Sequence, residues 1–257
     1  MSNKYTIEER VIERAMAIYP EIAELVPSST PVVSFGYPNK AVVATLGINP
    51  SSNEFQVGNG NKALLALGSK RLVDMEVLGV DSPKQLNREQ AVEVINGCYS
   101  YFSPQGKPLK WFDPLQLHVL DPINASYASG TACHLDLVQW ATDPVWQDKK
   151  MSKRSKKILL ENDKEFLKFQ LSNYDFEYIF LNGSTVISQV EKLGIVNLEK
   201  VAEVRFNRSG TMSHISRGNI GSKKIIGWGL NVGYGATLKE GLEDLQNWIT
   251  FNIERIS

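Results

Sequence analysis

The chain has 257 residues, of which 42% are hydrophobic and 22% are charged. This composition is typical of one large globular domain or two small ones, and it excludes an intrinsically disordered chain. Lysine and arginine total 28, and aspartate and glutamate also total 28. There is therefore no overall basic field, and any binding of nucleic acid must depend on local patches of positive charge.

The two cysteines, Cys98 and Cys133, lack metal-ligand spacing and cannot form a disulfide framework. They indicate a reducing compartment, weigh against structural zinc, and are expected to be core thiols. The first ten residues lack the apolar core of a signal peptide, and no run approaches the roughly 18 apolar residues of a membrane span. We therefore expect a cytoplasmic monomer that does not bind membranes and uses no metal or cofactor.

The first expected element is a helix over residues 7–25, because Thr6 followed by Glu9 resembles a capping box and apolar residues then recur at helical spacing. Ala41–Leu46 has the length and composition of a strand buried on both faces. Residues 56–110 form a long insertion, in which two helices are expected, around residues 64–73 and 91–95.

Three further strands are expected over residues 132–139, 178–181 and 223–228, and each ends in turn-forming residues. Helices are expected around residues 158–169 and over 237–253, and an added hairpin over 201–206 and 212–215. Strands that alternate with helices predict an α/β protein, a three-layer αβα fold with a central, mainly parallel sheet. We expect one domain that spans residues 1–257.

The most informative stretch is Gly47-Ile48-Asn49-Pro50-Ser51, which directly follows the first expected strand. In open α/β sheets, ligands bind just beyond the carboxyl ends of the strands, so these five residues are candidates for a binding site. Asn-Pro-Ser is also a common turn sequence, because Asn bonds its own backbone and Pro presets the next φ. A plain strand-to-helix turn is therefore the alternative interpretation.

This stretch is similar to the first motif of the uracil-DNA glycosylase superfamily. The similarity is greatest to the mismatch-specific and single-strand-selective branches, which carry Asn where the classical enzymes carry Asp. The resemblance implies a uracil-DNA glycosylase-like fold, and it implies that Asn49 positions the water that attacks the sugar C1′. Because an amide is not a strong base, Asn49 would act by orientation and by its carbonyl dipole, which suffices for a dissociative transition state.

His134 and Asp136 lie in the second expected strand, where the period of two puts both on one face. A surface-facing pair on an edge strand is the alternative. In the family the matching strand reads the flipped base, and the best register places Asp136 there. A carboxylate accepts from the exocyclic amine of cytosine, whereas uracil offers a carbonyl, so Asp136 favours a cytosine-derived base. A protonated Asp136 would instead donate to cytosine N3.

A glycine-rich segment over residues 227–235 contains four glycines and permits close approach of the backbone to a ligand. A tight strand-to-helix loop is the alternative. Family members carry a second motif here, typically His-Pro-Ser, which this chain lacks. Asn231 is the expected substitute for its catalytic polar group, and His214 is a rival. The same segment supplies one residue expected in the substrate pocket, Trp228, and two candidates for a wedge that enters the DNA duplex, Leu230 and Tyr234.

Phe55 is a candidate platform on which a flipped base stacks, and an ordinary buried Phe is the alternative. Aromatic residues also gather at the end of the insertion, where they would reshape the pocket for a bulky base: Tyr99, Tyr101, Phe102, Trp111 and Phe112. Residues 149–157 contain six cations. We expect contacts with DNA phosphates from Lys153, Arg154 and Lys156, although such a run is also typical of a solvated helix start.

These features predict a monofunctional DNA glycosylase that flips a modified pyrimidine and hydrolyses its N-glycosidic bond to leave an abasic site. Its partner would be double-stranded or single-stranded DNA that contains the modified base. Members of the superfamily that destroy phage DNA carrying glucosylated hydroxymethylcytosine fit a cytosine-reading Asp136, which indicates a role in antiviral defence. Two alternatives remain open: a noncatalytic protein that binds modified DNA, and a hydrolase of free nucleosides or nucleotides.

Overall fold

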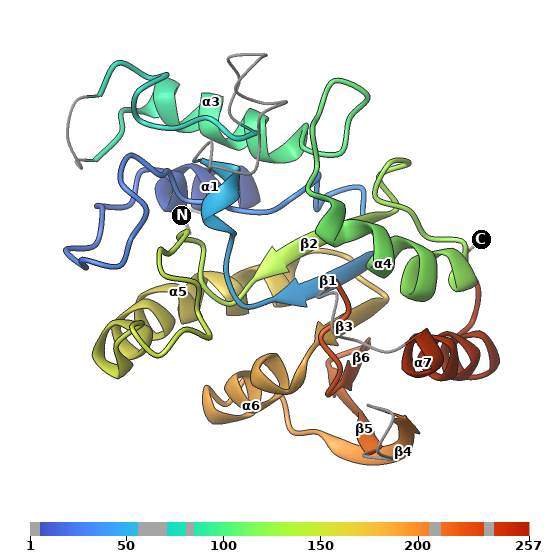
Figure 1. The fold of residues 1–257 in the computed structure, drawn as a ribbon. Helices are drawn as coiled ribbons and strands as arrows, with labels where there is room; N and C mark the ends of the chain where they lie inside the picture. The colour runs from blue at the N-terminus through green and yellow to red at the C-terminus, as the bar shows by residue number, and fades with distance from the viewer. Residues whose placement is uncertain (1–5, 56–70, 81–84, 206–211, 234–238, 257) are drawn as a thin grey trace, which may run out of the picture. The chain divides into compact units, whose positions relative to one another are not determined.

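The computed structural model describes residues 6–55, 71–80, 85–205, 212–233 and 239–256 (Figure 1). The chain forms two compact units, and each unit is built from three separate parts of the sequence. Unit 1 comprises Met1–Phe35, Ile48–Lys107 and Asp136–Phe169, and unit 2 comprises Gly36–Gly47, Pro108–Leu135 and Gln170–Ser257.

A six-stranded sheet forms the centre of unit 2, with the strand order β2-β1-β3-β6-β5-β4. Only the last residue of β2, Asp136, belongs to unit 1. The expected strands are confirmed, with these bounds: β1 Val43–Gly47, β2 Ala132–Asp136, β3 Tyr178–Asn182, β4 Glu199–Arg205, β5 Met212–Ile220 and β6 Lys223–Trp228.

The sheet is mixed. β1 pairs in parallel with β3 and β3 in parallel with β6, whereas β5 pairs antiparallel with both β6 and β4. The expected hairpin accounts for the antiparallel part, because it joins the edge of the sheet through β6. Strand order reverses at β1, which lies between β2 and β3, and open α/β sheets bind ligands at the carboxyl end of such a strand.

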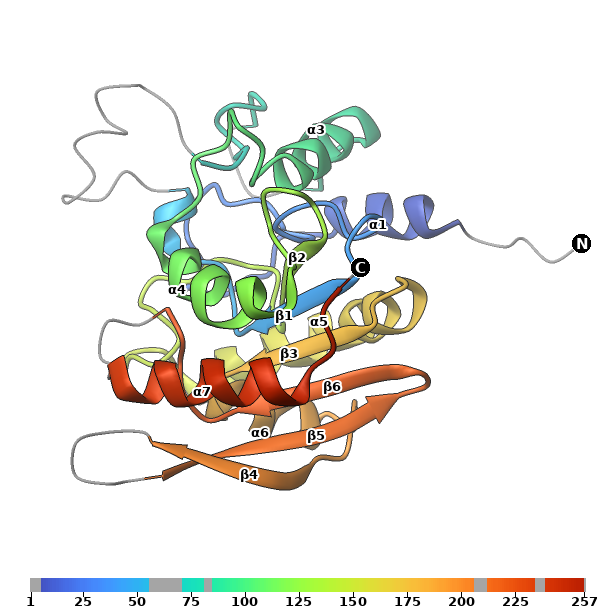
Figure 2. The ribbon, with the colours of Figure 1, turned by 90° about the vertical axis from the view of Figure 1, so that its right-hand side faces the viewer.

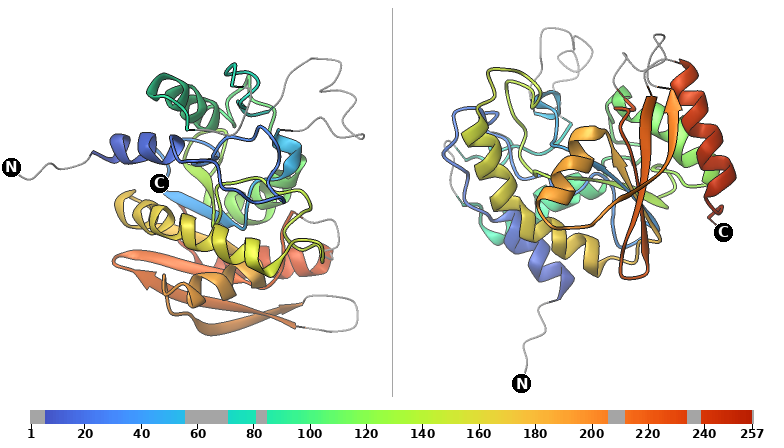
Figure 3. Two further views of the ribbon diagram at one scale, coloured as in Figure 1. Left: turned by 90° about the vertical axis from the view of Figure 1, so that its left-hand side faces the viewer. Right: turned by 90° about the horizontal axis from the view of Figure 1, so that it is seen from below.

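Helices cover both faces of the sheet in unit 2, as the α/β prediction requires. α6 (Ser184–Lys192) packs on β3 and β6, and α7 (Lys239–Asn252) covers the opposite face (Figures 2 and 3). α7 also packs along a run of short helical turns, to which it is joined by a 2.8 Å hydrogen bond between His118 Nδ1 and Gln246 Oε1. These turns are η2 Lys110–Phe112, α4 Asp113–Leu115, η3 Gln116–Leu120 and η4 Asp121–Ile123.

Unit 1 contains α1 (Ile7–Ala15), η1 (Ser52–Glu54), α3 (Arg88–Tyr99) and most of α5 (Lys153–Asn173). The cap expected for α1 is present, since Thr6 Oγ1 accepts a hydrogen bond from the Glu9 amide at 3.2 Å. The helix ends at Ala15 rather than near residue 25. Pro20 explains the difference, because it has no amide hydrogen to donate and disfavours a helical conformation at the residue before it.

The insertion over residues 56–110 agrees only partly with its prediction. The second expected helix is α3, which begins with a capping box between Asn87 and Gln90. The first falls mainly on residues 64–70, outside the described residues, and residues 71–80 form bends and turns. Cys98 and Cys133 are buried thiols, as expected. No helix within the described ranges is long and apolar enough to cross a membrane.

Candidate active site

Asn49 follows the carboxyl end of β1 by two residues, and three acceptors in unit 1 fix its side-chain amide. Asn49 Nδ2 donates to the Pro50 carbonyl oxygen at 3.1 Å, to Thr142 Oγ1 at 3.1 Å and to the Trp140 carbonyl oxygen at 3.4 Å. Because carbonyl oxygens only accept, these contacts determine which end of the amide is the NH₂ group. The Asn49 side chain therefore has one defined orientation.

The other end of this amide, Asn49 Oδ1, accepts no hydrogen bond from any residue that the structure describes. Asn49 is only half-buried, so the oxygen can accept from a bound water or substrate. The stretch is also a strand-to-helix turn, since Ser51 Oγ accepts from the Asn53 amide at 3.2 Å and caps η1. Both interpretations of this stretch are therefore compatible with its structure.

Glu54, which is not among the site residues expected from the sequence, is a buried carboxyl in the same loop. Its side chain is 1% exposed, and the Tyr101 hydroxyl lies 2.9 Å from both Oε1 and Oε2. Burial is the largest of the effects that together raise the pKa of Glu54 to about 8; the Tyr101 hydrogen bond and the Arg71 charge act to lower it, and the charge of Asp136 acts to raise it. Glu54 is therefore mostly neutral at pH 7.

Residues 136–142 connect β2 to the contacts of Asn49. The Val138 amide donates to the Ile48 carbonyl oxygen at 2.9 Å, and Thr142 forms a bridge with Ser51. Asp136 is 5% exposed, and its carbonyl oxygen accepts from Gln139 Nε2 at 3.0 Å. Asp136 is therefore not the surface residue that the alternative interpretation of this strand describes.

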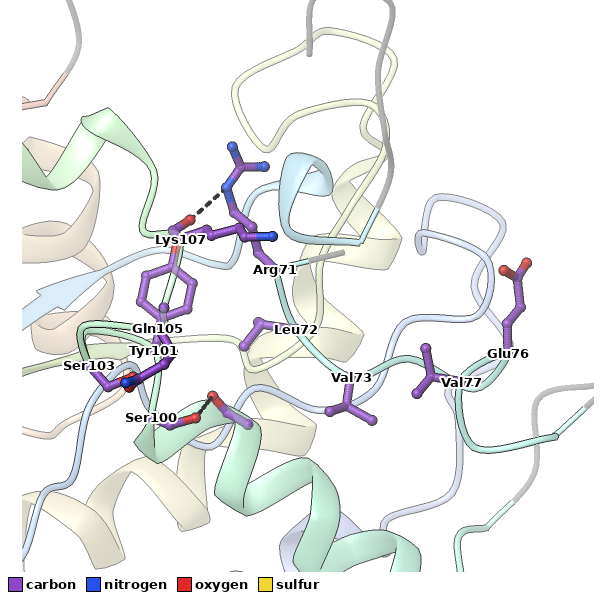
Figure 4. A pocket seen from close by; sticks show the side chains of 12 residues that line it. Arg71, Leu72, Val73, Glu76, Val77, Ser100, Tyr101, Ser103, Gln105 and Lys107 are labelled. Carbon is purple, nitrogen blue, oxygen red and sulfur yellow. Dashed lines mark hydrogen bonds between the residues drawn. The ribbon is translucent and has the colours of Figure 1, made fainter. Parts of the chain in front are cut away.

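A pocket of about 810 Å³ lies in the part of the insertion that belongs to unit 1 (Figure 4). Arg71 and Lys107 supply positive charge to its wall, and Arg71 is fixed by hydrogen bonds from Nε to the Lys107 carbonyl oxygen and from Nη1 to the Asn53 carbonyl oxygen, both at 2.9 Å. Tyr101 also lines the pocket and links it to Glu54. Phe55, the candidate stacking platform, is itself buried.

The basic segment, residues 149–157, leads into α5, whose first residue is Lys153. Lys153 and Arg154 are exposed, and Lys156 Nζ lies 5.8 Å from the centroid of the Trp146 ring. Among the described residues, none of the six cations forms an ion pair. Cations in a first helical turn repel the positive end of the helix dipole by about 0.3–1 kcal/mol each, and an anion would relieve this repulsion.

In unit 2, His134 is 2% exposed and lies between aromatic rings, so it also is not a surface residue. Its Nδ1 is 2.7 Å from Thr45 Oγ1, and its ring makes edge contacts with Trp111 and Phe112 at centroid distances of 5.3 and 5.2 Å. Thr45 Oγ1 is also 2.7 Å from the Tyr127 hydroxyl. A chain of hydrogen bonds and rings therefore fixes His134.

Asn182, the last residue of β3, holds the glycine-rich segment in place. Its Oδ1 accepts from the Val232 amide at 2.9 Å and from Trp228 Nε1 at 3.1 Å, and its Nδ2 donates to the Val232 carbonyl oxygen at 2.8 Å. A longer contact of 3.4 Å joins Asn182 Nδ2 to Asn231 Oδ1. Trp228 is fully buried, and Asn231 is half-buried.

The remaining candidates are the two possible wedge residues, Leu230 and Tyr234, and His214, the alternative to Asn231. Leu230 is 0% exposed, so its side chain is not presented to a duplex in this conformation. Tyr234 lies outside the described residues. His214 pairs with Glu203 across the β4–β5 hairpin, with 3.0 Å between Nδ1 and Oε1. Gly233 has a φ of 113°, and an added Cβ there would lie 2.6 Å from Trp111 Nε1, so only glycine fits this approach.

The described residues contain no group of three or more His, Cys, Asp or Glu side chains placed to hold a metal ion. No protein-family model matches the chain, and a search of curated proteins finds no significant match.

Proposed function

We propose that this protein is a monofunctional DNA glycosylase, with a uracil-DNA glycosylase-like fold, that removes a modified cytosine-derived base and leaves an abasic site. The observation that carries the proposal is the amide of Asn49, whose nitrogen is held by three acceptors while Oδ1 is left to accept. A carbonyl dipole with a fixed direction is what water positioning needs. The resemblance of Gly47–Ser51 to the first glycosylase motif supports the same role.

In the proposed reaction, Asn49 Oδ1 accepts a hydrogen bond from a water and directs its lone pair toward the sugar C1′. The N-glycosidic bond breaks with its electron pair going to the base, and the sugar gains oxocarbenium character. The water oxygen then bonds to C1′ and releases a proton to solvent, while the departing base takes up a proton from solvent. Asn49 need not become protonated, so an amide is sufficient.

Asp136 is the residue proposed to select the base. Its carboxylate would accept a hydrogen bond from the exocyclic amine of a cytosine, and it would face a carbonyl if uracil were bound. Glu54, the neighbouring carboxyl in unit 1, is mostly neutral and adds little negative charge beside it. Asn231 is proposed to stabilise the departing base, and this role comes from the sequence alone.

Two features of unit 1 suit a modified base in DNA. The pocket in the insertion presents hydroxyl and amide groups of Ser100, Ser103 and Gln105, which suit the hydroxyls of a glucosyl group on hydroxymethylcytosine. The cations of the basic segment, which form no ion pair with other described residues, suit DNA phosphates. Destruction of such phage DNA would be an antiviral activity.

The test is an excision assay on otherwise identical duplexes that contain uracil, cytosine, methylcytosine, hydroxymethylcytosine or glucosylated hydroxymethylcytosine. Abasic sites are converted to strand breaks with alkali. We expect breaks with a modified cytosine and loss of the breaks in Asn49→Ala. Asn53→Ala is the matched control, because Asn53 is in the same loop with an exposed side chain that makes no hydrogen bond within the described chain.

Three outcomes would contradict the proposal. Retention of modified duplexes without breaks would indicate the noncatalytic binder, and release of bases only from free nucleosides would indicate the nucleoside hydrolase. Efficient excision of plain uracil that is unchanged in Asp136→Asn would refute the role of Asp136.

A further inference from the structure

A buried ion pair contacts the segment of residues 136–142, which supplies two of the acceptors of the Asn49 amide. Arg14 Nη2 of α1 donates to Asp163 Oδ1 of α5 at 2.7 Å, and the two side chains are 10% and 0% exposed. Burial raises the pKa of Asp163 to about 6, although the charge of Arg14 acts to lower it. The cost of removing both charges from water is therefore large at this position.

Gln139 connects this pair to the backbone of Asp136. Its Oε1 accepts from Arg14 Nε at 3.0 Å, and its backbone amide donates to Asp163 Oδ2 at 2.7 Å. Its Nε2 donates to the Asp136 carbonyl oxygen at 3.0 Å. The ion pair therefore fixes the position of Gln139, and Gln139 fixes the backbone of Asp136.

Trp140, the residue after Gln139, links Arg14 to Asn49. The guanidinium carbon of Arg14 lies 5.7 Å from the centroid of the Trp140 ring, and the Trp140 carbonyl oxygen accepts from Asn49 Nδ2. Arg14 thus contacts this segment at two consecutive residues, through a hydrogen bond and through an aromatic ring.

We infer that Arg14, Asp163 and Gln139 are positioning residues, which set the orientation of the Asn49 amide and the backbone of Asp136. This inference rests on the proposed function. Stability alone does not explain the pair, because well-packed apolar residues of similar volume often replace a buried ion pair at no cost in stability. Apolar residues cannot supply the hydrogen bonds to both the side chain and the amide of Gln139.

The decisive variant is the double substitution Arg14→Met with Asp163→Leu, which removes both charges together. We expect it to fold, but to shift the side-chain amide resonance of Asn49, assigned by its loss in Asn49→Ala. On the modified duplex, we expect kcat to fall about 100-fold because the Asn49 amide loses its orientation, and KM to rise because the backbone of Asp136 is no longer fixed.

The matched control is Arg10→Met with Glu13→Leu, which removes an exposed ion pair from the same helix. We expect neither the Asn49 resonance nor kcat to change. Gln139→Met provides a second test by the same two measurements, which decides the question if the double variant does not fold. If a folded variant keeps the Asn49 resonance at its wild-type position and also keeps the wild-type kcat, the inference is overturned. If the wild type excises no base, the proposed function fails, and the resonance alone decides whether these residues position Asn49.

Discussion

The buried carboxyl of Glu54 should make the stability of the protein depend on pH in a way that one substitution removes. Its pKa is about 8 in the folded protein, compared with 4.5 as the ordinary value. The folded state therefore holds this proton more tightly than the unfolded chain does. Between these two values, stability contributed by the neutral form is progressively lost as the pH rises.

One pKa unit corresponds to about 1.4 kcal/mol, so between pH 5 and pH 7 this proton alone should lower the free energy of unfolding by about 2–3 kcal/mol. Glu54→Gln removes the titration and keeps an acceptor for the Tyr101 hydroxyl. The free energy of unfolding of the variant, relative to that of the wild type, should therefore rise by that amount between pH 5 and pH 7. The measurement is urea unfolding of both proteins at half-unit steps of pH, with the difference between them plotted against pH.

A constant difference between the two proteins from pH 5 to pH 7 would refute the reasoning. Tyr101→Phe provides the complementary test, because the Tyr101 hydrogen bond lowers the pKa of Glu54. Without that donor the pKa of Glu54 should rise. The free energy of unfolding of Tyr101→Phe, relative to that of Glu54→Gln, should therefore keep falling up to a higher pH than the free energy of the wild type does.

Three further predictions concern the site. Thr142→Val removes one acceptor of Asn49 with little change in shape, and we expect about a 10-fold fall in kcat, measured on the modified duplex with unchanged thermal stability. Asn182→Leu leaves buried donors and an acceptor at the end of β6 and in the loop after it without partners. The free energy of unfolding measured in urea should therefore fall by about 3–5 kcal/mol. A fall of less than about 1 kcal/mol would contradict this prediction. Lys153→Glu with Arg154→Glu should weaken DNA binding and reduce its dependence on salt by about two phosphate contacts, whereas an unchanged salt slope in a binding titration would remove this patch from the interface.

Much of the sheet could be predicted from the sequence, because its inner strands are short apolar runs that end in turn residues. β1, β3 and β6 have this pattern, and the structure places them together. The helical turns over residues 110–123 could not be predicted in this way. Pro114 and Pro122 divide the run into pieces too short to show helical periodicity.

The candidate site was only partly visible in the sequence. Asn49 could be found because it follows a buried strand in a recognisable motif. Asp163 could not, because it lies among polar residues of α5 whose neighbours are mostly exposed, and its partner Arg14 is 149 positions away. Glu54 was hidden for a different reason, since Ser51 and Glu54 have the spacing of a capping box, which predicts an exposed carboxyl.

The pairing of β1 with β3 has a consequence for how the chain folds during synthesis. Val43 pairs with Tyr178, 135 residues later, so β1 has no partner on that side until most of the protein has been made. At about 5–20 residues per second, this delay lasts on the order of 10 seconds. During this time an apolar strand edge is open to pairing with other chains.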